Sequence, residues 1–227
     1  MAIRGGRGDH QSCHRFFDFD QKAASTLYAP WKINDVSNAG TPVLDFVSGD
    51  PNGVFELRHD AEAEAQRLTL YWDDDLIIPA TARPIFEARV KLNLAGATLT
   101  ADQRAVWGMA SALNLALDNI QTNVWFRVEG ASNAIVLEGD DGTTDTDDQA
   151  TSPATSIVDD AFHIYRIDFT NLSAIAFTID GQAVGTVSCP LLTAADLLQP
   201  YFEIQKDGGA DTDSLEVDYC EVTWIRA

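Results

Sequence analysis

Apolar and polar residues alternate along much of the chain, whereas the spacing of an amphipathic helix is scarce. In residues 86–92, which read FEARVKL, every second residue is apolar and the residues between them are charged. Such alternation places the apolar side chains on one face of a β-strand and the charged side chains on the other. The same reasoning predicts strands at residues 54–58, 68–72, 124–129, 164–169, 175–179, 201–205 and 215–224.

Turn-forming residues separate these segments. The dipeptide Asp180-Gly181 lies between two alternating runs, which favours a β-hairpin with a type I′ turn. We expect short helical turns at residues 100–104, where Thr100 can act as the N-cap, and at residues 193–197. Residues 140–156 are rich in Asp, Thr and Ser, which is typical of a long surface loop.

Many short strands joined by Gly- and Asp-containing turns predict an all-β fold, a two-sheet antiparallel jelly-roll sandwich with few short helical turns. The chain has 227 residues, a length at which a β-sandwich commonly forms one domain. We therefore divide it into an extended N-terminal arm, residues 1–15, and a single β-sandwich domain, residues 16–227.

The balance of charge excludes some partners. The chain carries 35 acidic and 15 basic residues, a formal net charge of −20. Such a surface repels nucleic acid phosphates and anionic membranes, so we expect neither as a partner. No apolar run has the length of a transmembrane helix, and the N-terminus lacks the apolar core of a signal peptide. We expect a soluble protein made in a cytoplasm, with Cys13, Cys189 and Cys220 as reduced thiols.

Three segments, in order, resemble the concanavalin A-like lectin/glucanase superfamily. They are FEARVK at residues 86–91, HIYRIDF at 163–169 followed by FTIDG at 177–181, and VDYCEVTW at 217–224. In that superfamily the first is a central strand, the second a hairpin that turns at Asp-Gly, and the third the closing strand. The resemblance implies the jelly-roll fold, which serves lectins, hydrolases and structural modules alike.

Three other segments resemble uncharacterised virion proteins of tailed phages that carry this sandwich. They are WFRV at residues 125–128, EGDDG at 138–142 and LQPYF at 198–202. This second resemblance implies a non-enzymatic virion structural protein, a capsid decoration or head/tail surface protein assembled in the host cytoplasm. The expected partners are the major capsid protein or another virion protein and, in a homo-oligomer, further copies of the chain.

Basic residues gather in the N-terminal arm of an otherwise acidic chain, where Asp9 is the single acidic residue of the first fifteen. We expect the arm to be attracted to carboxylates on a virion protein or a neighbouring copy, with apolar contacts anchoring its ends. The candidate assembly residues are Ile3, Arg4, Arg7, Arg15, Phe16 and Phe17.

The alternative function is that of a carbohydrate-binding, lectin-like module, in which aromatic side chains on the concave sheet stack against sugars. Trp72 and Trp125 alternate out of step with their apolar neighbours, so we expect these two to be exposed. The candidate glycan-binding residues are Trp72, Trp125, Arg127 and Glu129.

A glycoside hydrolase is the third hypothesis. Residues 216–221, EVDYCE, match the E-x-D-x-x-E pattern of laminarinase-type glucanases, which hold two carboxylates about 5–5.5 Å apart. Here the motif falls on the predicted closing strand, and regular alternation separates Glu216 and Asp218 from Glu221 unless a bulge intervenes. We therefore expect no catalytic residues.

Acidic residues also crowd the segment that follows residue 139. Carboxylates in a flexible loop can bind calcium, and the candidate ligands are Asp140, Asp141, Asp145 and Asp147. Their spacing lacks the alternating ligands of an EF-hand, and a solvated acidic loop is the commoner structure. We expect no cofactor, with calcium at this loop as the alternative.

Overall fold

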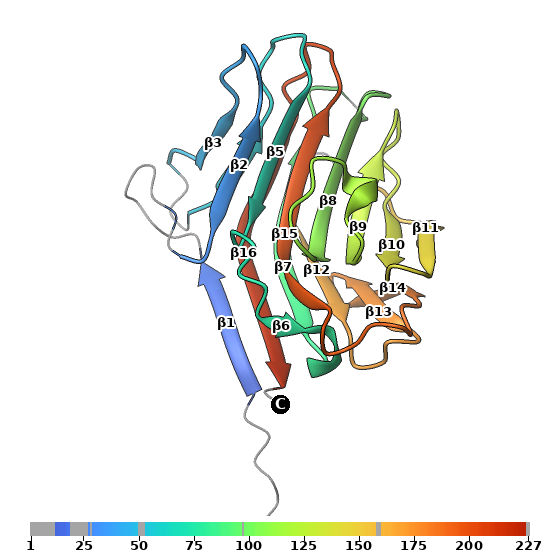
Figure 1. Ribbon diagram of the computed structural model, residues 1–227. Helices are drawn as coiled ribbons and strands as arrows, with labels where there is room; N and C mark the ends of the chain where they lie inside the picture. Colours follow the sequence, from blue (N-terminus) through green and yellow to red (C-terminus); the bar gives the residue numbers. More distant parts are fainter. Residues whose placement is uncertain are drawn as a thin grey trace, which may run out of the picture.

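The computed structural model describes residues 12–18, 27, 29–49, 53–96, 98–157 and 160–225. Two antiparallel sheets pack face to face, and Figure 1 looks onto one of them with the other behind. Sheet A consists, in spatial order, of β14 (Gln182–Val187), β13 (Ile175–Ile179), β12 (His163–Asp168), β7 (Ile85–Asn93), β16 (Ser214–Ile225), β4 (Phe55–Arg58) and β3 (Val43–Phe46), with β1 (Ser12–Asp18) paired to β16. Sheet B consists of β11 (Asp145–Ala150), β10 (Val136–Asp140), β9 (Asn123–Glu129), β8 (Gln103–Ala110), β15 (Leu197–Lys206), β5 (Gln66–Tyr71) and β2 (Lys32–Val36), with β6 (Ile78–Pro79) paired to β15. The predicted all-β sandwich is confirmed.

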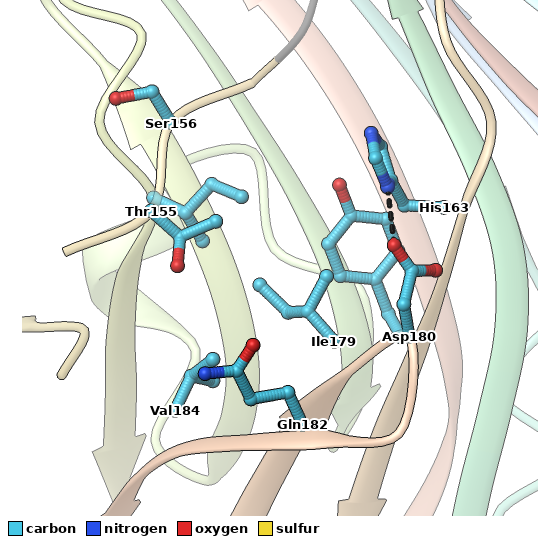
Figure 2. A pocket seen from close by; sticks show the side chains of 9 residues that line it. Thr155, Ser156, His163, Ile179, Asp180, Gln182 and Val184 are labelled. Atoms are coloured by element: carbon cyan, nitrogen blue, oxygen red, sulfur yellow. Dashed lines mark hydrogen bonds and ion pairs between the residues drawn. The ribbon is translucent and has the colours of Figure 1, made fainter. Parts of the chain in front are cut away.

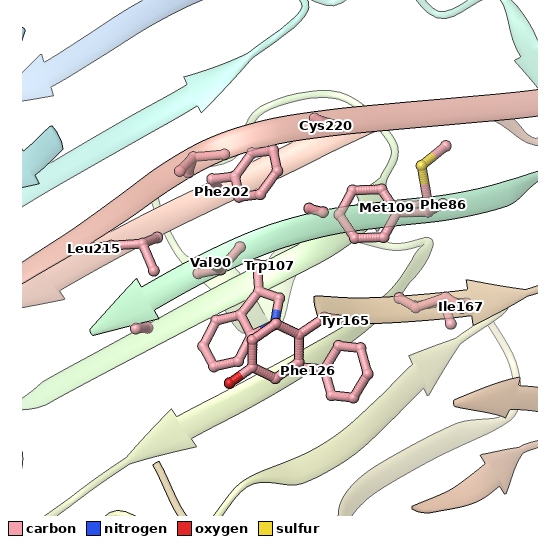
Figure 3. Close-up of a cluster of buried hydrophobic side chains, with 14 of the residues drawn as sticks. Phe86, Val90, Trp107, Met109, Phe126, Tyr165, Ile167, Phe202, Leu215 and Cys220 are labelled. Carbon is pink, nitrogen blue, oxygen red and sulfur yellow. The ribbon is translucent and has the colours of Figure 1, made fainter. Parts of the chain in front are cut away.

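The hydrophobic core lies between the sheets and is built by their inward-facing side chains (Figure 3). Tyr165 of β12 in sheet A packs edge-on against Trp107 of β8 and Phe126 of β9 in sheet B, with ring centroids 4.9 and 5.0 Å apart. Edge-to-face packing of this kind adds about 0.5–1.5 kcal/mol per pair beyond the burial of the rings. These contacts bind the two sheets to each other.

The predicted hairpin at residues 177–184 is confirmed as β13 and β14. Asp180 and Gly181 both have positive φ angles, 50° and 78°, as a type I′ turn requires. The backbone N–H of Asp180 also donates to the carbonyl of Ile164 on β12, 2.8 Å away, so the turn is fixed to the neighbouring strand.

Three local predictions differ from the structure. Each predicted helical turn is reduced to a single hydrogen-bonded turn, from Gln103 N–H to the Thr100 carbonyl at 3.0 Å and from Asp196 N–H to the Thr193 carbonyl at 3.3 Å, because β8 begins at Gln103 and β15 at Leu197. In the described residues the 3₁₀ turns lie instead at η1 (Ala80–Ala82) and η2 (Leu117–Asn119). Residues 140–156 are not one loop, because β11 occupies Asp145–Ala150 as the polar edge strand of sheet B.

The boundary of the predicted arm also differs. β1 pairs with β16 from Ser12, opposite Ile225, to Asp18, opposite Tyr219, so residues 12–15 belong to sheet A. Of the candidate assembly residues, Arg15, Phe16 and Phe17 lie on this strand, whereas Ile3, Arg4 and Arg7 lie outside the described residues.

The outer face of sheet B is partly covered by the loop of residues 111–122, which includes η2 (Figure 1). Its Leu117 and Ile120 form a second, smaller apolar cluster with outward-facing residues of four strands, namely Tyr71, Val106, Ala110, Trp125 and Tyr201. The central strands of sheet B are therefore buried on both faces. No helix among the described residues has the length and apolar character needed to span a membrane.

Candidate functional site

β9 presents Trp125, Arg127 and Glu129 on the outer face of sheet B, because Val124, Phe126 and Val128 point into the core. The sequence therefore predicts the direction of Trp125 correctly. The expected exposure of Trp125 is wrong, because loop 111–122 covers it and leaves 1% of it accessible. Its indole Nε1–H donates to Glu138 on β10, 2.7 Å away.

Trp72 is not exposed either. It follows β5 in step with Leu68 and Leu70, points into the core and packs edge-on against Trp31 with ring centroids 5.9 Å apart. Tyr71 is the residue of this strand end that faces outward, onto loop 111–122. Trp72 therefore belongs to the core and lies apart from the candidate site.

Arg127 ties the covering loop to the sheet. Its guanidinium donates to Asp118 of the loop at 3.0 Å, to Glu138 at 3.1 Å and, through Nε, to Glu129 at 2.8 Å. A guanidinium offers five N–H donors in a rigid fork, which suits it to hold several carboxylates in fixed positions. Arg127 thus sets where Asp118 lies, although the Asp118 side chain itself is largely exposed.

Burial changes the pKa of both side chains of the Arg127–Glu138 pair. It raises the pKa of Glu138 to about 7, against the lowering effect of Arg127 and of the Trp125 indole. Burial lowers the pKa of Arg127, but the carboxylates of Glu138 and Glu129 outweigh it and hold that pKa above its ordinary value. Both residues of the pair are buried.

A polar cleft of about 580 Å³ opens between loop 111–122 and the turn that joins β10 to β11. We call it the polar cleft. The loop lines it with Asn114, Asp118, Asn119 and Gln121. The turn lines it with Asp140, Gly142, Thr143 and Asp145.

The turn side of the polar cleft is shaped by its own aspartates. Asp140 accepts from the N–H of Gly142 at 2.7 Å, and Asp141 accepts from the N–H groups of Thr144 and Leu191 at 2.6 and 3.0 Å. Partial burial, followed by repulsion from nearby carboxylates, raises the pKa of Asp140 and Asp145. The cleft is therefore a preformed, acidic and polar surface.

The four candidate calcium ligands do not come together as a metal site in the described residues. Within the described ranges, no group of three or more His, Cys, Asp or Glu side chains is placed to hold a metal ion. Both oxygens of Asp141 already cap backbone N–H groups, and Asp147 lies exposed on the edge strand β11. What the structure brings together instead is Asp140 and Asp145 with Asp118, the partner of Arg127.

A second buried carboxylate, Glu203 of β15, lies on the same outer face. It accepts hydrogen bonds from the Tyr201 hydroxyl at 2.6 Å and from the Thr69 hydroxyl at 2.9 Å, and Arg67 lies 3.3 Å from its other oxygen. Burial raises its pKa to about 7, although Tyr201, Thr69 and Arg67 oppose the shift. Glu203 had no sequence signal beyond its place on an alternating strand.

The E-x-D-x-x-E motif lies on the outer face of sheet A, on the other side of the molecule. A bulge between Val217 and Tyr219 shifts the register, so Glu216 pairs opposite Lys91 and Glu221 opposite Glu87 on one face. The bulge therefore places Glu216 and Glu221 on the same face, which regular alternation would not do. Glu216 is almost fully buried and forms an ion pair with Lys91 at 2.9 Å.

No family model and no curated protein sequence matches the chain. Solved structures do match. The carbohydrate recognition domain of Emp47p aligns with a TM-score of 0.61 at 9% identity, over 98% of this chain and 100% of that chain. The endo-1,3-beta-glucanase from Streptomyces sioyaensis aligns with a TM-score of 0.60 at 18% identity, over 99% and 100% of the two chains. A protein of unknown function from Shewanella oneidensis MR-1 aligns with a TM-score of 0.64 at 13% identity, over 95% and 89%.

The fold is the concanavalin A-like lectin/glucanase jelly-roll. The jelly-roll fold that the sequence resemblance implied is thus confirmed. At these identities the concanavalin A-like neighbours show the fold alone, and they include both lectin domains and glucanases. The resemblance to tailed-phage virion proteins finds no support among them.

Proposed function

We propose that this protein is a non-catalytic carbohydrate-binding module and that the polar cleft is its glycan site. The observation that carries the proposal is the preformed cleft itself, on a fold shared with carbohydrate recognition domains. Its walls combine amide, hydroxyl, carboxylate and backbone groups. These groups match the paired donors and acceptors of sugar hydroxyls.

Several of the cleft's polar groups are available to a ligand. The side chains of Asn119, Gln121 and Thr143 make no hydrogen bond within the part of the chain that the structure describes. Leu115 follows the lining residue Asn114 in the chain and is 55% exposed, so loop 111–122 also carries an exposed apolar side chain next to a lining residue. Polar walls with one apolar neighbour fit a glycan better than an apolar ligand.

The buried carboxylates favour binding over hydrolysis. A glycosidase needs two carboxyl groups about 5–9.5 Å apart on either side of the scissile bond. Glu138 and Glu203 lie on β10 and β15, which β9 and β8 separate, so three strand spacings put them about 14 Å apart. The Glu203 carboxylate also accepts a hydrogen bond from Thr69 on β5, which lies on the side of β15 away from β10.

A glycan array in calcium-containing and calcium-free buffer tests the proposal. The protein is expected to bind at least one class of glycan, and Asn119→Ala and Gln121→Ala are each expected to weaken that binding about tenfold. The matched control is Gln149→Ala, an exposed amide on β11 that does not line the cleft, which is expected to bind like the parent. Absence of binding across the array, or equal binding by all three variants, would contradict the proposal.

Hydrolysis at β16 is tested separately. Incubating the parent and Glu216→Gln with laminarin and mixed-linkage glucan is expected to release no reducing sugar from either. Release by the parent that is lost in the variant would show that the E-x-D-x-x-E motif is catalytic.

The virion role, with an assembly arm and a capsid partner, stays a prediction of the sequence, as does the homo-oligomer. Its arm residues Ile3, Arg4 and Arg7 lie outside the described residues, and the similar structures add no support.

A further inference from the structure

A second cavity, of about 200 Å³, opens beside the β13–β14 hairpin, away from the polar cleft (Figure 2). We call it the hairpin pocket. Ile135, Ile179 and Val184 form its apolar walls, and Thr155, Ser156, His163, Tyr165, Asp180 and Gln182 supply its polar groups. No sequence pattern points to this site, because its residues come from four separate stretches of the chain.

His163 and Asp180 contact each other at the hairpin pocket. His163 Nδ1 lies 2.6 Å from one carboxylate oxygen of Asp180, as the dashed line in Figure 2 shows. The other oxygen of Asp180 accepts from the N–H of Ile164 at 2.9 Å. Both oxygens of Asp180 therefore have a partner, whereas the buried His163 Nε2 has none among the described residues. A neutral ligand that carries hydroxyl groups can bond to this nitrogen.

Its remaining polar groups are open to a ligand. Tyr165 is 1% exposed, yet its hydroxyl makes no hydrogen bond to another described residue. The hydroxyl of Ser156 and the amide of Gln182 are likewise without a partner among those residues. The Tyr165 hydroxyl is not one of the fully buried unpaired polar atoms, so a ligand in the hairpin pocket can reach it and bond to it.

The size and lining together define a ligand class. Cavities of about 150 Å³ accept one benzene molecule, so the hairpin pocket has room for one substituted six-membered ring. Branched aliphatic walls fit the C–H face of such a ring, while two hydroxyls and an amide fit its hydroxyl groups. We propose that the hairpin pocket binds a single neutral, hydroxyl-rich ring, such as one sugar residue. This site is independent of the polar cleft and does not rest on it.

Saturation-transfer NMR with a panel of methyl hexopyranosides tests the proposal, using methyl glucuronide and cyclohexanol for comparison. At least one neutral hexoside is expected to bind at least tenfold more tightly than either comparison compound. Gln182→Leu and Ser156→Trp, both at exposed positions, are expected to reduce this binding at least tenfold, the second by blocking the mouth. Tyr165→Phe is expected to reduce it roughly fivefold.

Asn119→Ala in the polar cleft is the control, expected to keep hexoside binding in the hairpin pocket. Absence of hexoside binding would overturn the proposal, as would equal binding of cyclohexanol or unchanged binding by Gln182→Leu and Ser156→Trp. Loss of binding in Asn119→Ala alone would assign the signal to the polar cleft and would also overturn it.

Discussion

Glu203 lies at the centre of sheet B with its side chain fully removed from solvent. A buried carboxylate is stabilised in its neutral form, which is why its pKa rises from 4.5 to about 7. Between pH 4.5 and about 7, the Glu203 carboxyl is therefore mostly protonated in the folded protein and mostly ionised in the unfolded chain. The stabilisation is complete below pH 4.5 and is lost as pH rises through about 7.

The first prediction follows for Glu203→Gln, whose side chain is neutral at every pH. The variant is expected to match the parent in free energy of unfolding near pH 4.5 and to exceed it by roughly 2–3 kcal/mol at pH 8. His59, whose pKa burial and Lys206 lower to about 4, contributes to both proteins and cancels in the difference. Urea unfolding at the two pH values measures it, and parallel pH profiles would show that Glu203 does not titrate differently in the folded state.

Lys206 is another buried charged residue that stabilises the fold. Its ammonium lies among four backbone carbonyls, those of Asp60, Glu62, Gly209 and Asp211, at 2.6, 2.9, 3.1 and 3.3 Å. It joins the segment between β4 and β5 to the segment between β15 and β16.

Replacing Lys206 by Met removes the donor that the four carbonyls share, and among the described residues only the carbonyl of Glu62 keeps a backbone donor, the N–H of Glu64. The second prediction is a loss of roughly 2–5 kcal/mol in the free energy of unfolding. Lys32→Met is the control, because Lys32 makes an exposed ion pair with Asp73, and it is expected to cost about 0–1 kcal/mol. Equal losses in the two variants, measured by urea unfolding, would mean that the hydrogen bonds from Lys206 to the four carbonyls do not add to the free energy of unfolding.

Among the strands, β8 has a glycine, Gly108, where the backbone of β9 comes close. A Cβ on Gly108 would lie 2.5 Å from the carbonyl oxygen of Val124 and 2.7 Å from the Cα of Trp125. The absence of a side chain lets β9 approach, so that Trp125 lies beneath loop 111–122 and packs near Tyr201.

The third prediction is that Gly108→Ala destabilises the fold by about 1–3 kcal/mol through overpacking. It is also expected to shift tryptophan fluorescence, because Trp125 must move. Gly208→Ala is the control, since its added Cβ meets nothing within 4 Å and is expected to change stability by less than about 0.5 kcal/mol. The same denaturation curve for both variants would remove the proposed role of Gly108.

The sequence pattern locates most of the strands, including β9 and β15, whose residues are nearly all buried. β7 and β13 alternate between buried and partly exposed residues, and both were predicted within a residue or two. β8 is buried along nearly its whole length because loop 111–122 covers its outer side, so its residues do not alternate and it was not predicted. β11 was missed for the opposite reason, because nearly all of its residues are exposed and polar.

At the scale of the whole molecule, the fold follows from pattern and the site does not. The alternation and the Asp180-Gly181 turn suffice for an antiparallel sandwich. The polar cleft depends on the packing of loop 111–122, which lies between two strands of which one, β8, was not recognised. Asn114, Asn119 and Gln121 were therefore not singled out, although the run of amides between residues 114 and 123 is visible in the sequence.

An amide NMR titration with the best glycan from the array tests glycan binding in the polar cleft. Chemical shift changes are expected to gather at residues 114–121 and 140–145 and to saturate with one dissociation constant. Binding in the polar cleft is contradicted if no shifts change at millimolar glycan, or if the changes gather on the outer face of sheet A around Glu216 and Glu221.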